Sequence, residues 1–545
     1  MTKLQRITRF GTRVFASIAL LTSLNSMADE IPYLTKTTPA QLVVDGKPFI
    51  MLGGELGNSS SADTPYMQAL WPKLVQMHLN TVLAPVYWDL LEPQPGKFDF
   101  TLVDDLLATA RQHQTKLVLL WFGSWKNSMS TYTPSWVKRD ATQFPLAQDR
   151  TGKNQKILTP FSENNLKADI HAYSALLSHL KKVDAKQRTV IMIQVENEIG
   201  MLPDARDYHP AATAAFNAPV PAELLTYLSA HKAQLAPEIS ARWAANGNKT
   251  SGTWAAIFGQ GLATDELFMA WHFARYTNAV AAAGKAIYPL PTYVNAALNR
   301  PGVEPGKYPS AGPLPHVIDL WKAGAPALDL LSPDFYNPDF KYWNDRYTRV
   351  GETLFIPEIH ASPDNAAKVF FTLGHYRAIG FSPFSIESTE TPESEPIGTS
   401  YAVLTPLIPM ITEASAAGKI DGALVDKANP ETRFTLGDFV FTVKHDYTLG
   451  WSPAAKEEVW PEGGVLIMQT GEEDFWVSGT SVVITVTSTK PGLQAGLDYL
   501  YEGEFNKGQW QRGRNLNGDQ NHQGRHIRIP ALETGTQEVR LYTHP

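Results

Sequence analysis

The sequence contains no cysteine among its 545 residues. This absence excludes disulfides and thiolate metal sites, and it excludes a lipoprotein, because no thiol is present to carry the lipid. Other hydrolase and nucleotide signatures are missing as well, since there is no G-x-S-x-G, no H-E-x-x-H and no P-loop. Serine-hydrolase, zinc-protease and P-loop chemistry are therefore disfavoured.

The sequence has fewer basic than acidic residues, with 47 Lys and Arg and 54 Asp and Glu, which gives a net charge of −7. The chain has neither a basic patch nor a polybasic run, so we expect no nucleic-acid partner and no binding to an anionic membrane surface. The 14 histidines show no ligand-like spacing. We therefore expect no metal ion and no other cofactor.

The first 28 residues have the layout of a secretory signal peptide. The stretch MTKLQRITRFGTR has four basic residues and no acid, and the apolar run VFASIALLTSL follows it. Ser26 and Ala28 are small residues at the −3 and −1 positions of a cleavage site. The apolar run is much shorter than the ~20 residues of a spanning helix, and no later segment is long enough. We expect cleavage near Ala28 and a periplasmic or secreted protein without a membrane anchor.

Short apolar segments alternate with helical patterns over residues 29–418. The helical patterns include 64–80, with Asp63 or Thr64 as its cap, and 101–113, 264–284 and 401–420. Eight such repeats predict an α/β fold, a (β/α)8 TIM barrel with long βα loops at 123–160 and 201–260. GGELGNSS lacks Rossmann spacing, which disfavours an open doubly wound sheet. The expected strands are 49–55, 81–88, 116–122, 190–196, 290–295, 327–336, 354–359 and 380–386.

Residues 419–545 differ in character, with alternating and β-branched runs such as EDFWVSGTSVVITVTST between turn signals. This pattern predicts a C-terminal all-β sandwich domain. A structural role that covers barrel surface is expected for it, with carbohydrate binding as the alternative.

Carboxylates follow two of the expected barrel strands. The fourth strand, in TVIMIQVENEIG, ends in Glu196, Asn197 and Glu198, and the seventh, in FIPEIHASPD, ends in Glu358 and His360. The carboxyl ends of barrel strands surround the active site. Two carboxyl groups across a cleft are the minimum apparatus for glycoside hydrolysis. Strand alternation places Glu196 and Glu198 on one face, so it does not choose between them.

Several motifs resemble glycoside hydrolase family 35, the β-galactosidases, within the barrel clan that carries Asn-Glu on strand four. In order, they are GGELGNSS, NTVLAPVYWDLLEPQPGKFDF, LLWFGSWKN, PSWVKRD and QVENEIG. The tail LYEGEFNKGQWQRGRNLNGDQNHQGRHIRIP resembles the β-domain of a shorter bacterial branch of that family. The chain departs from the family in GSWKN, where an Ala-Glu element is common, and at Pro85, where a tyrosine is common.

The resemblance implies roles for residues at two strand ends. Glu198 would be the acid/base and Glu358 the nucleophile of a retaining exo-β-galactosidase, with Asn197 bonded to the sugar 2-OH. Glu196 would orient a neighbour or bind a hydroxyl group. Glu387 and Glu352 are rival acids, but Glu387 lies one strand later and Glu352 at the opposite strand end.

Further residues at the expected mouth are candidates for binding the sugar. Trp125 could stack on galactose or lie in the core, Tyr336 could bond the nucleophile or the sugar, and Glu55 could hold a galactose hydroxyl. The other substrate-binding candidates are Lys126, Asn127 and His360.

The resemblance implies a carbohydrate substrate, terminal β-D-galactose on oligosaccharides such as xyloglucan fragments. Two alternatives remain open. One is another retaining glycosidase of the same clan, of the β-mannanase or β-glucanase type. The other is a noncatalytic carbohydrate-binding barrel, which a retained pair of glutamates disfavours.

Overall fold

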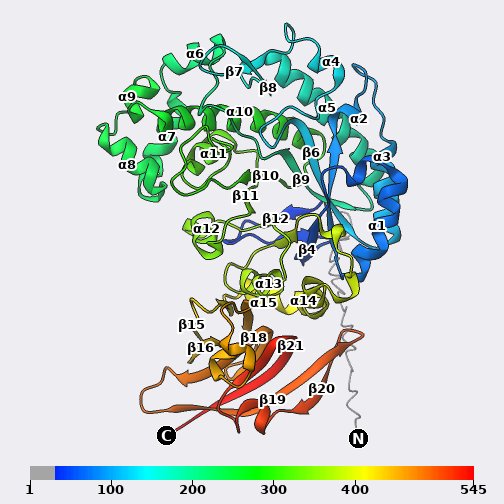
Figure 1. Ribbon diagram of the computed structural model, residues 1–545, viewed down its shortest axis with the longest axis vertical. Helices are drawn as coiled ribbons and strands as arrows, with labels where there is room; N and C mark the ends of the chain where they lie inside the picture. Colours follow the sequence, from blue (N-terminus) through cyan, green and yellow to red (C-terminus); the bar gives the residue numbers. More distant parts are fainter. Residues whose placement is uncertain (1–30) are drawn as a thin grey trace, which may run out of the picture.

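The computed structural model describes residues 31–545, so the expected signal peptide, residues 1–28, lies outside the described residues. Eight parallel strands close a barrel in which β4 pairs with β13 and the others follow in chain order (Figure 1). The predicted barrel is confirmed, with all eight expected strands. They are β4 (Met51–Glu55), β5 (Thr81–Tyr87), β6 (Lys116–Lys126), β9 (Val190–Asn197), β10 (Thr292–Ala297), β11 (Leu330–Phe335), β12 (Ile356–Ile359) and β13 (Gly380–Pro383).

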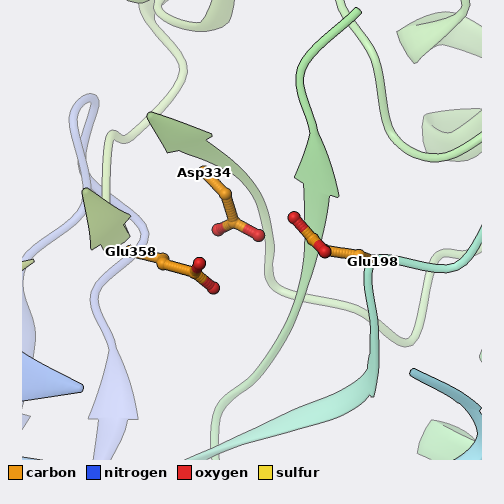
Figure 2. Close-up of side chains that lie close together, drawn as sticks. All are labelled: Glu198, Asp334 and Glu358. Carbon is orange, nitrogen blue, oxygen red and sulfur yellow. The ribbon is translucent and has the colours of Figure 1, made fainter. Parts of the chain in front are cut away.

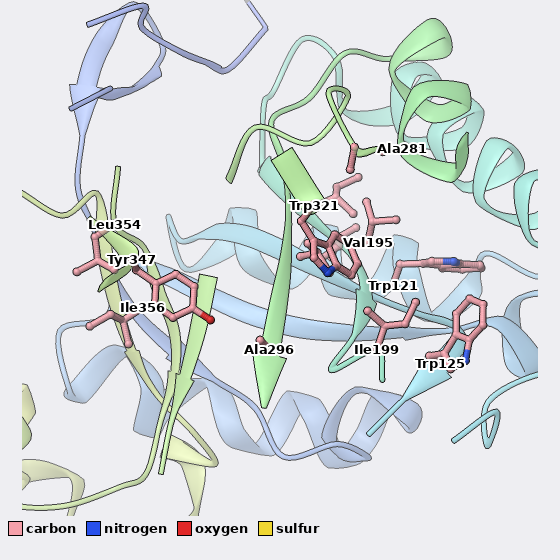
Figure 3. Close-up of a cluster of buried hydrophobic side chains, with 14 of the residues drawn as sticks. Trp121, Trp125, Val195, Ile199, Ala281, Ala296, Trp321, Tyr347, Leu354 and Ile356 are labelled. Carbon is pink, nitrogen blue, oxygen red and sulfur yellow. The ribbon is translucent and has the colours of Figure 1, made fainter. Parts of the chain in front are cut away.

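Helices surround the strands, and apolar side chains fill the layer between. Figure 3 shows part of this layer, with Trp121 and Val195 on strands and Ala281 and Trp321 on helices. Strands buried on both faces explain why their sequences are almost continuously apolar. The barrel helices are α1 (Thr64–Gln76), α2 (Trp88–Leu91), α3 (Thr101–Gln112), α5 (Glu163–Asp184), α10 (Leu262–Ile287), α11 (Ile318–Gly324), α12 (Phe340–Tyr347), α13 (Asn365–Gly374), α14 (Pro396–Leu404) and α15 (Ile408–Ala416).

Two of these helices test the sequence signals for helix ends. Asp63 caps α1 by accepting a hydrogen bond from the Tyr66 N–H at 2.8 Å, as expected. The single helix expected over 401–420 is wrong, because the chain forms α14 and α15 with a short 3-10 turn between them. Pro406 and Pro409 lie in the first turns of that 3-10 segment and of α15, where a proline is tolerated. Within residues 31–545, none of the helices combines the length and the apolar character needed to cross a bilayer.

The two long loops that follow β6 and β9 carry structure of their own. The first contains α4 (Ser135–Lys138) and the hairpin β7 (Leu146–Gln148) and β8 (Asn154–Leu158). Both insertions start from carboxyl ends of strands, so they build up the end of the barrel where active sites lie. The second contains α6 (Pro210–Asn217), α7 (Ala222–Ala230), α8 (Pro237–Ala245) and α9 (Trp254–Phe258).

The opposite end of the barrel is closed by a small sheet of β1 (Tyr33–Leu34), β2 (Leu42–Val44) and β3 (Lys47–Phe49). Leu42 and Val44 are buried in one cluster with interior residues of the barrel such as Val118 and Phe355. A packed interior closed at this end leaves the carboxyl ends of the strands as the place for chemistry.

The all-β region that the sequence predicts after the barrel is confirmed, and its eight strands form one connected antiparallel sheet. The pairing of β18 with β21 shifts at Ser481 and Leu532, which both have positive φ, and on its other edge β18 pairs with β17 up to Thr480 and with β16 from Val482. The strands are β14 (Ile420–Val425), β15 (Glu431–Leu436), β16 (Phe439–His445), β17 (Gly463–Gln469), β18 (Asp474–Ser488), β19 (Gln494–Asn506), β20 (Gln509–Asn515) and β21 (Ile527–His544).

Helices α13 to α15 lie between the barrel and this sheet (Figure 1). The contact is close at β17, because a Cβ atom on Gly464 would lie 2.0 Å from the carbonyl oxygen of Ala367 on α13. Backbone atoms on both sides leave no flexible side chain that could move away. A glycine at position 464 is therefore what allows the sheet to approach the barrel.

Gly464→Ala is expected to lower the free energy of unfolding by about 1–3 kcal/mol, because the added methyl group forces the two layers apart. Gly535→Ala is the matched control, since a Cβ there would have no atom within 4 Å and its strand belongs to the same sheet. Thermal and urea unfolding of the two variants would test this. Equal stability of both variants would contradict the assignment of close packing to Gly464.

Candidate active site

Three carboxylates from different strands converge at the carboxyl end of the barrel. Glu198 follows β9, Asp334 lies near the end of β11 and Glu358 lies on β12 (Figure 2). One oxygen from each carboxylate lies within 4.8 Å of one from each of the others. All three residues are buried, with exposed fractions of 5%, 0% and 5%. Such a concentration of buried acids is costly unless protons or donors compensate it.

The backbone at the end of β9 is irregular, and this irregularity separates Glu196 from Glu198. Both residues have positive φ, 62° and 44°, a conformation that is rare outside glycine and is often found at functional sites. The pairing of β6 with β9 also slips, from Trp121 opposite Val195 to Lys126 opposite Asn197. The expectation that regular alternation places both glutamates on one face is therefore wrong.

Glu196 lies behind the site rather than in it. It is fully buried, and its Oε2 accepts a hydrogen bond from the Trp125 N–H at 2.8 Å. Burial, followed by the charge of Asp169, raises the pKa of Glu196 well above the ordinary value. Asp169 on α5 in turn accepts from the Ser124 hydroxyl at 2.5 Å. Glu196 thus holds the segment that leads to Lys126.

Glu198 is oriented by the side-chain amides of two asparagines. The Asn127 side chain donates to its Oε2, and its own N–H donates to Asn295 Oδ1 at 3.0 Å. The other end of the Asn295 amide donates to Asp334 Oδ2 at 2.6 Å. Burial, the largest influence, raises the pKa of Glu198 while the Lys126 charge opposes the rise. A buried carboxyl with an elevated pKa can serve as a general acid.

Glu358 accepts a hydrogen bond from the Tyr336 hydroxyl. Burial, followed by the charge of Glu198, raises the pKa of Glu358 to about 7, while Lys126, Tyr336 and Glu55 favour its ionised form. The Glu358 carboxylate thus has one hydrogen-bond donor, on Tyr336, and its Oε2 has no partner among residues 31–545.

Two further acids accompany this pair. Burial, followed by the charge of Glu358, raises the pKa of both Glu55 and Asp334 well above the ordinary range. Glu55 lies at the end of β4, and neither of its carboxyl oxygens has a hydrogen-bond partner among residues 31–545, whereas Asp334 Oδ2 accepts from Asn295. A raised pKa favours the protonated form of each flanking acid, which limits the repulsion among the four carboxyl groups.

Lys126 supplies the positive charge at this site. The residue is buried, with 7% of its surface exposed. Its positive charge favours the ionised forms of Glu55, Glu198 and Glu358. Its ammonium group lies 5.1 Å from the centre of the Phe122 ring, which stabilises a cation in a poorly hydrated place.

Three other residues that the sequence predicts to bind the sugar lie in different environments: one in the core, one buried without a side-chain hydrogen bond to any described residue and one exposed. Trp125, labelled in Figure 3, is fully buried. It packs edge-on against Phe273 and Tyr276, so its indole belongs to the core. Asn197 is buried, and neither end of its amide has a partner among residues 31–545, which leaves it free to bond a ligand. His360 is exposed beside Tyr336, with the ring centres 6.0 Å apart.

The two rival acids are engaged elsewhere. Glu387 accepts from the Gly57 N–H at 2.8 Å and from the Ser60 hydroxyl at 2.5 Å, so it fixes the loop after β4. Glu352 is exposed before β12 and forms an ion pair with Lys322 at 2.6 Å. Neither belongs to the convergent carboxylates.

Asp334 and Asn295 are the site residues that sequence reasoning missed. A signal was present, because both lie at the ends of expected strands, where Glu198 and Glu358 were found. The oxygens of Glu198, Asp334 and Glu358 could also hold a divalent cation, since hard cations take carboxylate ligands. Donor groups on Asn127, Asn295 and Tyr336 compensate the same carboxylates directly.

Comparisons with known proteins find two matching family models and one curated relative. Residues 65–245 match the model of glycoside hydrolase family 42, described as β-galactosidase, and residues 397–528 match a domain of unknown function, DUF5597. A β-galactosidase of Xanthomonas manihotis is 28% identical over 176 residues, which are 32% of this chain and 27% of that protein. The chain thus matches about a quarter of the curated relative's length, and the resemblance to family 35 stays a prediction.

Solved structures of two β-galactosidases are also similar to this chain. That of the psychrophilic Marinomonas ef1 is 12% identical, with a TM-score of 0.45 and coverage of 67% of this chain and 61% of that one. That of Bacillus circulans sp. alkalophilus is 14% identical, with a TM-score of 0.46 and coverage of 67% and 57%. The sequence match over residues 65–245 identifies a β-galactosidase-like domain and supports a glycoside hydrolase.

Proposed function

We propose that this protein is a retaining exo-β-galactosidase, which removes terminal β-D-galactose from oligosaccharides. The observation that carries the proposal is the approach of Glu198 and Glu358, whose nearest carboxylate oxygens lie within 4.8 Å. Inverting glycosidases need about 6.5–9.5 Å between their carboxyl groups to admit a water, whereas retaining enzymes need only about 5–5.5 Å.

In the first step a Glu358 oxygen attacks the anomeric carbon of galactose as the bond to the leaving oxygen breaks. Glu198 gives its proton to that oxygen, so the remainder of the oligosaccharide leaves as an alcohol. The product is an ester between galactose and Glu358. The Tyr336 hydroxyl, which donates to Glu358 in the free protein, orients the attacking carboxylate.

In the second step Glu198, now ionised, takes a proton from water as the water oxygen attacks the anomeric carbon. The ester bond breaks, the electron pair returns to Glu358, and galactose leaves with its original β configuration. The proton taken by Glu198 restores the starting state. Lys126 stabilises whichever of the two carboxylates is ionised at each stage.

Release of 4-nitrophenol from 4-nitrophenyl β-galactoside tests this function, with the β-glucoside, β-mannoside and α-galactoside as controls. We expect activity on the β-galactoside alone. Galactose-terminated xyloglucan oligosaccharides would then be compared with lactose, because the family resemblance points to xyloglucan fragments as the natural substrate.

The alternatives give different outcomes in the same experiment. An enzyme of the β-mannanase or β-glucanase type would leave the galactoside intact and shorten a mannan or glucan chain. A noncatalytic carbohydrate-binding barrel would be silent on every substrate but would still bind saccharides. Either result would overturn the proposed activity.

Tyr336→Phe is expected to move the acidic limb of the kcat/KM profile to higher pH. The lost hydrogen bond stabilises ionised Glu358, so its removal raises a pKa that already lies at about 7. A nucleophile must be ionised, so activity would be lost at a higher pH as the pH falls. Profiles from pH 4 to 9 would show the shift; an unchanged limb with a uniformly lower rate would contradict it.

A further inference from the structure

A large pocket opens on the same end of the barrel as the carboxylates. Its volume is about 710 Å³, within the ~300–1,000 Å³ range of small-molecule sites. Its walls are α8, the start of α10, the loop after β10, and α12. Each wall follows the carboxyl end of β9, β10 or β11, so the pocket and the candidate active site share one face.

Two consecutive residues connect the pocket to the candidate nucleophile. Tyr336 donates its hydroxyl to Glu358, and the next residue, Asn337, donates its side-chain N–H to the carbonyl oxygen of Asn299 at 3.1 Å. Asn299 lines the pocket, and its side-chain oxygen Oδ1 is buried without a partner among residues 31–545. The residue after Tyr336 therefore contacts a residue of the pocket wall, Asn299, whose side-chain oxygen is an unused hydrogen-bond acceptor.

The polar wall is fixed in advance by buried contacts. Glu266, which is 1% exposed, accepts from Tyr308 and from His316 at 2.8 Å each and from the Ala311 N–H at 3.1 Å. A carboxylate with three partners does not rearrange when a ligand enters. These side chains are already ordered in the folded protein, so a ligand that binds here does not have to immobilise them and loses less conformational entropy.

At the rim, Arg346 bridges α12 and α8. Its guanidinium donates to Glu238 at 2.6 Å and to the Tyr342 hydroxyl at 2.8 Å. The Tyr342 side chain is still 50% exposed, so an aromatic ring held by an arginine borders the pocket. Such a ring offers an apolar face with a polar edge, which suits the face of a pyranose.

The charges of the wall identify the class of ligand. The lining has two acids, Glu238 and Glu266, and two arginines, Arg242 and Arg346, so its formal charges cancel when His316 is neutral. Neither an anion nor a cation is favoured by such a wall, whereas a neutral ligand rich in hydroxyl groups finds both donors and acceptors.

We propose that this pocket binds the uncharged saccharide on the leaving-group side of the scissile bond. This inference rests on the proposed function and adds to it that the enzyme recognises an oligosaccharide beyond the terminal galactose. The leaving saccharide would pass Tyr336 and Asn337 and lie against Tyr342.

Kinetics of Tyr342→Ala and Asn299→Ala test the proposal with two substrates. One is 4-nitrophenyl β-galactoside, which has no saccharide leaving group. The other is whichever of galactose-terminated xyloglucan oligosaccharide, β-1,4-galactotriose and lactose the wild type cleaves best. We expect kcat/KM for the oligosaccharide to fall about tenfold through KM, and that for the nitrophenyl substrate to change less than twofold.

Tyr66→Ala is the matched control, because Tyr66 is a tyrosine on α1 with 55% exposure that lies outside the pocket. Tyr342→Phe keeps the ring and should keep most of the oligosaccharide activity. Equal losses on both substrates, or no loss on the oligosaccharide, would overturn the proposal.

Failure of the proposed function gives a separate result. If the wild type cleaves no galactoside, calorimetric titration with degalactosylated xyloglucan oligosaccharide still examines the pocket. Binding that is lost in Tyr342→Ala and kept in Tyr66→Ala would support the saccharide site. Absence of binding to the wild type would overturn it.

Discussion

Replacing Glu358 by glutamine is expected to lower kcat/KM for 4-nitrophenyl β-galactoside by about 10⁴-fold or more, the scale of loss seen when a catalytic nucleophile is removed. The amide has nearly the size of the carboxylate, and its Oε1 can still accept from Tyr336, so the fold should be kept. It cannot form the galactosyl ester, because an amide oxygen is a poor nucleophile. Initial rates of nitrophenol release would measure the loss.

Glu352→Gln is the matched control for this substitution. Glu352 lies at the opposite end of the same strand, and its exposed ion pair with Lys322 contributes little to stability. Its activity should stay within twofold of the wild type. Survival of activity in Glu358→Gln, or an equal loss in both variants, would remove Glu358 from the role of nucleophile.

A smaller side chain at position 358 gives a stereochemical test of the same role. In Glu358→Gly, added azide can occupy the space of the carboxylate and attack the anomeric carbon from that side. One displacement inverts the configuration, so the product should be α-galactosyl azide. A β-galactosyl azide would mean that Glu358 lies on the opposite side of the sugar.

The barrel and the central pair of acids could be predicted because their signals are local and repeated. Each strand is a short apolar run between helical patterns. In this fold the last residues of every strand lie at the end of the barrel where active sites form. Glu358 could be placed at this end by that rule and the order of the strands, whereas the choice of Glu198 over Glu196 also needed the resemblance to family 35. The same rule, applied to the fifth and sixth strands, would have yielded Asn295 and Asp334.

The separation of Glu196 from Glu198 could not be read from the sequence. It depends on positive φ at both residues and on a slip against β6, and no glycine or proline marks either feature. The place of Trp125 depends on α10, which lies more than 100 residues later in the chain. Contacts of this kind arise from tertiary packing, whereas helical and strand periods are properties of neighbouring residues.

The break between α14 and α15 has a simpler cause. The apolar pattern of 401–420 is continuous, and Pro406 and Pro409 are the interruptions within its first half. A proline removes one helical hydrogen bond and clashes with the preceding turn, so it ends a helix unless it lies in the first turn. The two prolines are visible in the sequence, but the helical spacing of the apolar residues led to the prediction of one continuous helix.

Replacing Glu198 by glutamine is expected to have an effect that depends on the leaving group. An oligosaccharide leaves as a poor alkoxide unless it is protonated, so kcat/KM should fall about 10³-fold, within the range of general acid catalysis. A 2,4-dinitrophenolate needs no proton, so kcat/KM for the corresponding galactoside should fall less than tenfold. This substrate pair is an internal control, because a damaged fold would lower both values alike.

The second step should then become limiting in the same variant. Water attacks the galactosyl ester slowly without a base, so kcat for the dinitrophenyl substrate should fall and a burst of dinitrophenolate should precede the steady state. Azide needs no base, and in Glu198→Ala it can attack the ester from the vacated side to give β-galactosyl azide. A variant that loses both substrates equally and forms no β-galactosyl azide would show that Glu198 supports the structure of the site rather than proton transfer. The opposite configurations expected for the two azide products depend only on which face of the sugar each carboxylate occupies, so together they test the assignment of both residues.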